Sequence, residues 1–138
     1  MTAPLIMLVD DEVTFVETTA KRLDIRNIQT IKAFSGEECL ETLKTNQNLD
    51  VIILDVMMPG MDGIETLKAI KKESPLIEVI MLTGHATVDS AIECTKLGAF
   101  KYLEKPYDFD KLVEALKEAY HSRLQKKFES NRKRMEAI

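Results

Sequence analysis

The chain has 138 residues and a net charge of −4, with 45% hydrophobic and 30% charged residues. This balance is typical of one soluble globular domain with a hydrophobic core, and it excludes a disordered chain. The apolar runs, such as Leu5–Val9, are far shorter than the roughly 20 residues of a membrane-spanning helix. The first residues carry no basic region of a secretory signal. We therefore expect a cytoplasmic protein without a membrane segment.

The two cysteines, Cys39 and Cys94, lie far apart, and each is inside a segment of helical periodicity. Without a C-x-x-C spacing they predict neither a zinc site nor a redox motif. Buried, unreactive thiols are the simpler interpretation, and they agree with a reducing cytoplasm.

Five short apolar runs alternate with longer segments of helical period. The runs are Leu5–Val9, Ile28–Ala33, Val51–Leu54, Val79–Leu82 and Phe100–Leu103. The first, third and fourth are continuous and rich in β-branched residues, which is typical of strands buried on both faces of a parallel sheet. The second alternates between apolar and polar residues and so predicts an edge strand.

The helical segments have recognisable starts. Ser35 with Glu38, and Asp62 with Glu65, match the spacing of a capping box, and Asp108 is a suitable N-cap for the last helix. Helices that separate consecutive strands favour a parallel sheet with right-handed crossovers and helices on both faces. The predicted fold is therefore α/β, a doubly wound (βα)5 sheet.

Polar residues follow the apolar runs at the points where strands should end. Asp10 and Asp11 follow the first run, Asp55 the third, Thr83 the fourth and Lys105 the fifth. Because parallel strands end at the same edge of a sheet, we expect these side chains to converge there, where doubly wound folds bind ligands.

Three neighbouring carboxylates repel one another unless a cation neutralises them. Oxygen ligands select a hard ion such as Mg²⁺, and the absence of His and Cys among them argues against zinc. A metal, an ammonium group and a hydroxyl can together stabilise a phosphoryl group in transfer, and a carboxylate can accept it as an acyl phosphate.

Each of these residues has a simpler explanation when it stands alone. An Asp after an apolar strand is often only a helix N-cap or a turn former, and Lys105-Pro106 is a turn. Three chemical types placed at four strand ends in the right order are much harder to explain by chance. We therefore favour a functional site over these separate structural roles.

The segments LIMLVDDE, VIILDVMMPGMDG, VIMLTGHA and YLEKP resemble, in order and spacing, the receiver family of two-component response regulators across residues 5 to 120. The resemblance implies a flavodoxin-like fold with strand order 2-1-3-4-5 and a receiver domain at residues 1–120. It also implies a cis peptide bond between Lys105 and Pro106.

The resemblance implies a role for each site residue. Asp55 would be the phosphorylated residue. Asp11, Asp55 and the backbone carbonyl of Met57 would bind Mg²⁺ directly, and Asp10 would bind it through a water. Thr83 would hydrogen-bond one phosphoryl oxygen, and Lys105 would pair with another. Tyr102 would rotate inward when the domain is phosphorylated and so act as the switch residue.

The implied function is signal transduction in bacteria. A sensor histidine kinase or phosphotransfer protein would phosphorylate Asp55. The surface formed by the helix after Thr83, the strand Phe100–Leu103 and the last helix would then change, and this surface is one of two that could form a homodimer. The chain would catalyse only its own phosphorylation and dephosphorylation. A small-molecule phosphatase is disfavoured because the chain has no room for a substrate-pocket insert. A docking module without phosphorylation would lack a site residue, and none is missing.

The helical pattern from Asp108 continues to Ile138 without Gly or Pro, and residues 121–138 carry a net charge of +4. We expect a solvated helix face rather than a nucleic-acid site, because Glu alternates with the basic residues. The apolar stripe through Leu116, Tyr120, Leu124 and Phe128 drifts and is not a clean heptad. The extension could be a linker helix to an output domain of a larger transcriptional regulator or hybrid kinase, a dimerisation arm, or the end of a stand-alone regulator.

Neither of the two histidines is predicted to be a site residue. His85 follows a predicted strand end and could contact an attacking water, but an exposed loop imidazole is the simpler expectation. His121 is expected on the surface of the last helix.

Overall fold

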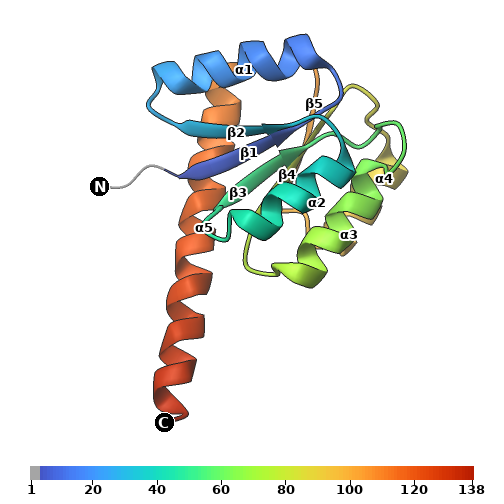
Figure 1. Cartoon of the computed structure of the whole chain (residues 1–138). Helices are drawn as coiled ribbons and strands as arrows, with labels where there is room; N and C mark the ends of the chain where they lie inside the picture. The colour runs from blue at the N-terminus through green and yellow to red at the C-terminus, as the bar shows by residue number, and fades with distance from the viewer. Residues whose placement is uncertain (1–3) are drawn as a thin grey trace.

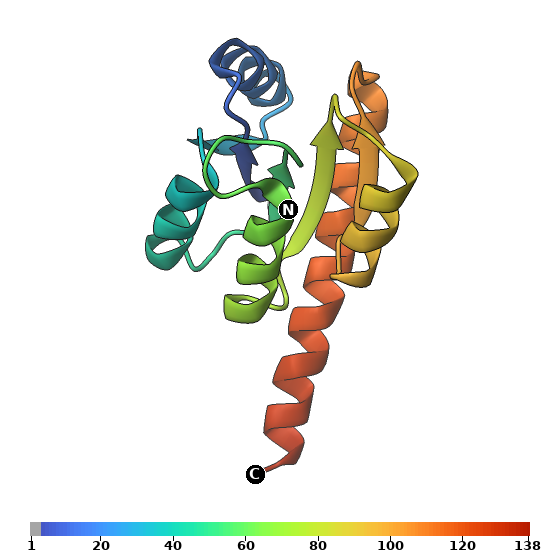
Figure 2. The same ribbon diagram turned by 90° about the vertical axis from the view of Figure 1, so that its right-hand side faces the viewer.

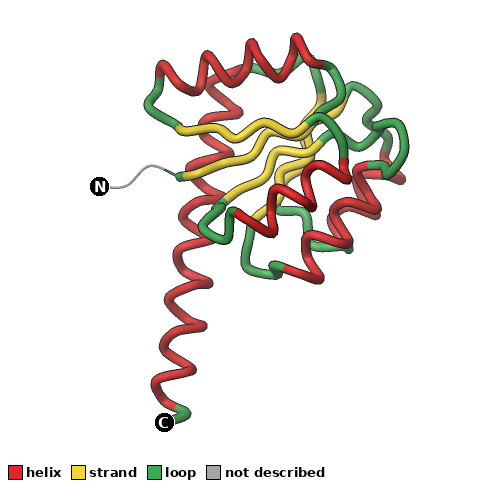
Figure 3. The backbone as a smooth tube through the Cα atoms, viewed as in Figure 1, coloured by secondary structure: helices red, strands yellow, loops and turns green. Residues whose placement is uncertain are grey.

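The computed structural model describes residues 4–138, which form five strands and five helices in alternation. The five parallel strands have the order β2-β1-β3-β4-β5, as expected. Figure 1 and Figure 3 show the sheet at the centre of the molecule, with loops gathered at the carboxyl ends of the strands. The elements are β1 Leu5–Val9, α1 Val13–Ile25, β2 Gln29–Ala33, α2 Gly36–Thr45, β3 Val51–Leu54, α3 Gly63–Glu73, β4 Glu78–Thr83, α4 Val88–Lys96, β5 Lys101–Glu104 and α5 Phe109–Glu136.

Helices cover both faces of the sheet and enclose two hydrophobic cores. On one face, α1 and α5 contribute Val16, Leu23 and Leu116 to the core. On the other, α2, α3 and α4 contribute residues that include both cysteines. Every residue of β3 and β4 is buried, whereas β2 and β5, at the sheet edges, keep exposed residues. The distinction between buried and edge strands agrees with the sequence patterns.

The N-caps largely follow the predicted residues. Ser35, Asp62 and Asp108 each accept a backbone N–H of the first turn of their helix. Glu38 accepts the backbone N–H of Phe34, one residue before the cap, so the expected capping box is displaced. A complete capping box occurs instead at Thr87 and Ser90, at the start of α4.

Both cysteines are free and buried, as expected. Burial raises the pKa of the Cys39 thiol to about 12 and that of Cys94 to about 11, so neither is a reactive thiolate at neutral pH. Within residues 4–138, no helix has the length and apolarity that crossing a membrane would require.

The last helix is one continuous element of 28 residues, and its second half extends beyond the rest of the molecule (Figure 2). We call residues 121–138 the arm. Leu124, Phe128, Met135 and Ile138 of the arm are exposed. The expectation that its basic residues are all solvated was wrong for Arg123, whose side chain is 8% exposed and lies 3.7 Å from Asp50. Arg123 also donates to the Leu49 carbonyl. A buried carboxylate on the sheet draws this guanidinium inward.

Candidate functional site

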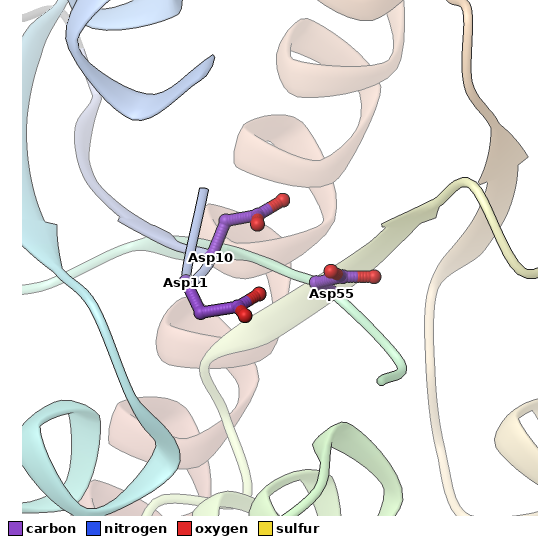
Figure 4. Close-up of side chains that lie close together, drawn as sticks. All are labelled: Asp10, Asp11 and Asp55. Atoms are coloured by element: carbon purple, nitrogen blue, oxygen red, sulfur yellow. The ribbon is translucent and has the colours of Figure 1, made fainter. Parts of the chain in front are cut away.

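The carboxylates of Asp10, Asp11 and Asp55 lie together at the carboxyl ends of β1 and β3 (Figure 4). One oxygen from each residue lies within 4.8 Å of the others, and this is an arrangement that could hold a metal ion. Asp10 and Asp55 are buried, whereas Asp11 is exposed. The register of the sheet explains the approach, because β1 and β3 are neighbours and the Asp55 N–H donates to the Val9 carbonyl.

Lys105 lies at the same edge and faces Asp10. Its Nζ is 2.5 Å from Asp10 Oδ2 and 3.2 Å from Glu12 Oε1. The Lys105–Pro106 peptide bond is cis, as predicted. The other oxygen of Asp10 accepts the N–H of Glu12 at 2.9 Å. Both oxygens of Asp10 therefore have protein donors.

Asp55 differs from Asp10 in having an oxygen without a protein donor. Its Oδ1 is buried and has no hydrogen-bond partner among residues 4–138. Burying a hydrogen-bond acceptor without a partner costs free energy, and such groups usually bind a ligand, an ion or water. Asp55 also belongs to the carboxylate cluster that could hold a cation.

The start of α3 lies directly against the backbone of Asp55. A Cβ on Gly63 would be 1.9 Å from the Asp55 carbonyl oxygen, and the Gly63 N–H donates to the Val56 carbonyl at 2.7 Å. Only glycine allows this approach. Gly63 therefore fixes the loop that carries Asp55 and Met57, whose side chain is exposed.

Thr83 ends β4 and is completely buried. Its Oγ1 accepts the N–H of His85 at 3.0 Å, and the His85 side chain is exposed, as expected. Tyr102 on β5 is half-buried, and its hydroxyl contacts Ser90 Oγ and the Thr87 N–H at the start of α4. Tyr102 is therefore tied to α4 in this structure.

Two pKa values at this edge are raised, that of Asp10 and that of Lys105. Burial raises the pKa of Asp10, and the charge of Asp55 adds to it, although the hydrogen bonds from Lys105 and Glu12 oppose the shift. Burial would lower the pKa of Lys105, but the hydrogen bond and charge of Asp10, with the charge of Asp55, raise it. The ammonium form of Lys105 is thus stabilised where negative charge accumulates.

Asp10, Asp11, Asp55 and Lys105, which the sequence placed at strand ends, come together in one cluster, and Thr83 lies at the end of the neighbouring strand β4. Three residues of the site were not predicted from the sequence. Glu12 and Phe15 contact the Lys105 ammonium, and Gly63 lies against the backbone of Asp55. A glycine directly after a helix N-cap was a visible cue for Gly63. No local pattern indicates that the start of α1 approaches the end of β5.

Comparison with known proteins agrees with this architecture. Residues 6–117 match the family described as the response regulator receiver domain. This chain belongs to that family. The receiver domain is similar to the transcriptional regulatory protein ZraR of Klebsiella oxytoca, with 40% identity over 120 residues. That match covers 86% of this chain and 27% of ZraR, so the chain spans about a quarter of the length of this relative.

Solved structures of receiver domains have the same fold. A receiver domain protein from Clostridium thermocellum superposes with a TM-score of 0.84 at 36% identity, covering 88% of this chain and 98% of the other. A CheY from Borrelia burgdorferi, solved in a complex with CheX, BeF3 and Mg²⁺, has a TM-score of 0.80 at 28% identity. That match covers 85% of this chain and 89% of the other.

Proposed function

We propose that this receiver domain accepts a phosphoryl group on Asp55 from a sensor histidine kinase or phosphotransfer protein in the cytoplasm. The observation that carries the proposal is the buried, unpartnered oxygen of Asp55 beside two further carboxylates. In the reaction, the P–N bond of a phosphohistidine breaks and a P–O bond forms to Asp55. The imidazole leaves and takes up a proton.

The residues present suit Mg²⁺. The cluster offers only carboxylate oxygens, and the orphaned Asp55 oxygen lacks a donor that would compete with a cation. Asp11, Asp55 and the Met57 carbonyl would hold the ion, and Asp10, whose oxygens are already engaged, would act through water. Bound there, Mg²⁺ would neutralise charge on the phosphoryl oxygens.

The protein side chains do the rest of the positioning. Lys105 is an ammonium group already at the rim, and it would move from Asp10 to a phosphoryl oxygen. Thr83 would donate its hydroxyl to another phosphoryl oxygen. Because both groups are buried or nearly so, their interactions with the added charge are strong. The chain would catalyse only its own phosphorylation and dephosphorylation.

The switch would start at Thr83. Drawing Thr83 Oγ1 toward the phosphoryl group would remove the acceptor of the His85 N–H and move the segment between β4 and α4. Tyr102 would then leave Ser90 and Thr87 and rotate inward. The surface of α4, β5 and α5, with its exposed Val88 and Ile92, would become a different binding face.

Intact-mass measurement after treatment with phosphoramidate and Mg²⁺ tests the acceptor. We expect one phosphoryl adduct in the wild type and in Asp24→Asn, an exposed aspartate of α1, and none in Asp55→Asn. EDTA and Asp11→Ala should each abolish the adduct. A full adduct in Asp55→Asn, or undiminished labelling without divalent ions, would reject the assignment. Steady turnover of a phosphate ester would instead support the small-molecule phosphatase.

The arm is proposed to pair with the arm of a second chain. Its exposed apolar residues, together with His121 and Asn131, alternate at steps of three and four residues from 121 to 138. This is the spacing of a two-stranded coiled-coil seam. The apolar stripe of the whole helix drifts because it joins two different faces. Leu112 and Leu116 lie on the face that packs on the sheet, whereas the apolar residues of the arm are exposed. The division into a receiver domain (1–120) and an arm (121–138) remains part of the proposal.

Sedimentation of Phe128→Asp beside its neighbour Lys127→Asp tests this pairing. We expect the wild type and Lys127→Asp to dimerise and Phe128→Asp to be monomeric, with higher salt favouring the dimer because the arm is basic. Truncation at Tyr120 is unsuitable, because it removes the buried Arg123. Monomers throughout at high concentration would contradict the dimer.

A further inference from the structure

The ring of Phe15 covers the ammonium group of Lys105. Phe15 lies in the first turn of α1, and the Lys105 Nζ is 4.0 Å from its ring centroid. The same nitrogen contacts the carboxylates of Asp10 and Glu12, so three groups of the β1–α1 segment surround it. The Lys105 side chain is only 13% exposed as a result.

Phe15 is itself held in place by Tyr107, two residues beyond Lys105. Their rings meet edge to face, with centroids 5.8 Å apart and planes at 81°. The Tyr107 hydroxyl is hydrogen-bonded to Thr19 Oγ1 at 2.9 Å, and Thr19 is buried on α1. The segment after β5 therefore contacts α1 through both Lys105 and Tyr107, and each of them contacts the Phe15 ring.

This arrangement addresses a difficulty inherent in a lysine. Its ammonium sits on a flexible four-carbon stem, and holding it in one place costs rotamer entropy. An aromatic face attracts a cation and, unlike a carboxylate, does not compete with a phosphoryl group for its N–H donors. Phe15 can therefore hold the ammonium near the rim while leaving its hydrogen bonds available.

We propose that Phe15 is a positioning residue for phosphoryl transfer, acting through Lys105. The proposal rests on the proposed function, because it takes Lys105 as the group that pairs with the phosphoryl oxygen. A role in packing alone would make any apolar side chain of similar size sufficient. A role through the ring face requires an aromatic residue and disappears when Lys105 is absent.

The experiment measures the rate of phosphorylation by phosphoramidate with saturating Mg²⁺ in five proteins: wild type, Phe15→Leu, Phe15→Tyr, Lys105→Ala and the double variant Phe15→Leu/Lys105→Ala. We expect Phe15→Leu to be about fivefold slower, which corresponds to about 1 kcal/mol of transition-state stabilisation. Phe15→Tyr should stay within about twofold of the wild type, since it keeps the aromatic face. The double variant should be no slower than Lys105→Ala, because the interaction energy of the pair is then already lost.

Several results would overturn the proposal. Equal losses in Phe15→Leu and Phe15→Tyr, or no loss in Phe15→Leu, would show that the ring face is not required. A further loss in the double variant relative to Lys105→Ala would assign Phe15 to packing of the domain. A wild type that takes up no phosphoryl group would instead reject the proposed function itself, so the two failures are distinguishable.

Discussion

Both ends of the sheet carry buried carboxylates, but within residues 4–138 only the carboxyl end has a buried carboxylate oxygen without a hydrogen-bond partner. At the amino ends of β3 and β4, Asp50 and Glu78 are surrounded by donors from α3, β1 and the arm. At the carboxyl ends, Asp55 keeps a buried oxygen without a partner beside Asp10 and Asp11. The same residue type therefore serves structure at one end and is proposed to serve chemistry at the other.

The partners of Glu78 come from two helices. Its carboxylate lies 3.5 Å from Lys71 Nζ at the end of α3 and 2.9 Å from Lys126 Nζ of the arm, and it accepts the Ser122 hydroxyl. Asp50 accepts the Leu5 N–H at 3.0 Å and faces Arg123. These contacts attach the first turns of the arm to the sheet. Buried charges with such partners stabilise a fold only as a complete set.

The largest expected effect is at the paired end. Glu78→Ala should lower the free energy of unfolding by about 3 kcal/mol, because it leaves the nearly buried Lys71 without its counter-charge. Glu73→Ala, at the exposed last residue of α3, should change it by less than about 0.5 kcal/mol. Urea denaturation measures both. Phosphorylation of Glu78→Ala should persist, and its loss would show that the two ends are not independent.

The second prediction concerns acid. Burial alone would raise the pKa of Glu78, but hydrogen bonds from Ser122 and Lys126 and the charge of Lys71 lower it below its ordinary value of 4.5. A depressed carboxyl pKa contributes stability that is present above pH 4.5 and is lost as pH falls through the folded-state value. Wild type should therefore lose more stability below pH 4.5 than Glu78→Gln. Parallel pH curves of the two proteins would contradict this.

The third prediction is an effect of opposite sign at the unpaired end. Asp55→Asn should raise the free energy of unfolding by about 1 kcal/mol in the absence of divalent ions, because it removes one of three adjacent negative charges. Thermal melting with EDTA measures this increase. Destabilisation by this substitution would show that Asp55, like Glu78, has a structural role.

The smallest expected effect separates two adjacent lysines of the arm. Lys126→Ala should destabilise by roughly 0.5–1 kcal/mol, since its side chain is 45% exposed and solvent screens part of the pair with Glu78. Lys127→Ala, its exposed neighbour, should have almost no effect. Equal effects of the two substitutions in urea denaturation would mean that the ion pair contributes nothing measurable.

Local patterns were sufficient for the strands and helices because the apolar period and the caps are properties of short segments. Continuous apolar runs identified β1, β3 and β4, although β4 begins one residue earlier, at Glu78. A glutamate at that position does not suggest burial. It is buried because Lys71 and Lys126 neutralise its charge and Ser122 donates a hydrogen bond to it, and α3 and the arm, which supply these residues, are far apart in the chain.

For the site, the sequence by itself determined which residues lie at the strand ends. Each of them comes one or two positions after an apolar run: Asp10, Asp11, Asp55, Thr83 and Lys105. Parallel strands bring such residues to one edge whatever the details of packing. Only the tertiary structure decided how each group is partnered: that Asp10 is engaged by Lys105, that Asp55 keeps an open oxygen, and that Phe15 covers the ammonium. Partnership depends on side chains from distant elements meeting within a few ångströms, and no local period of the sequence encodes that distance.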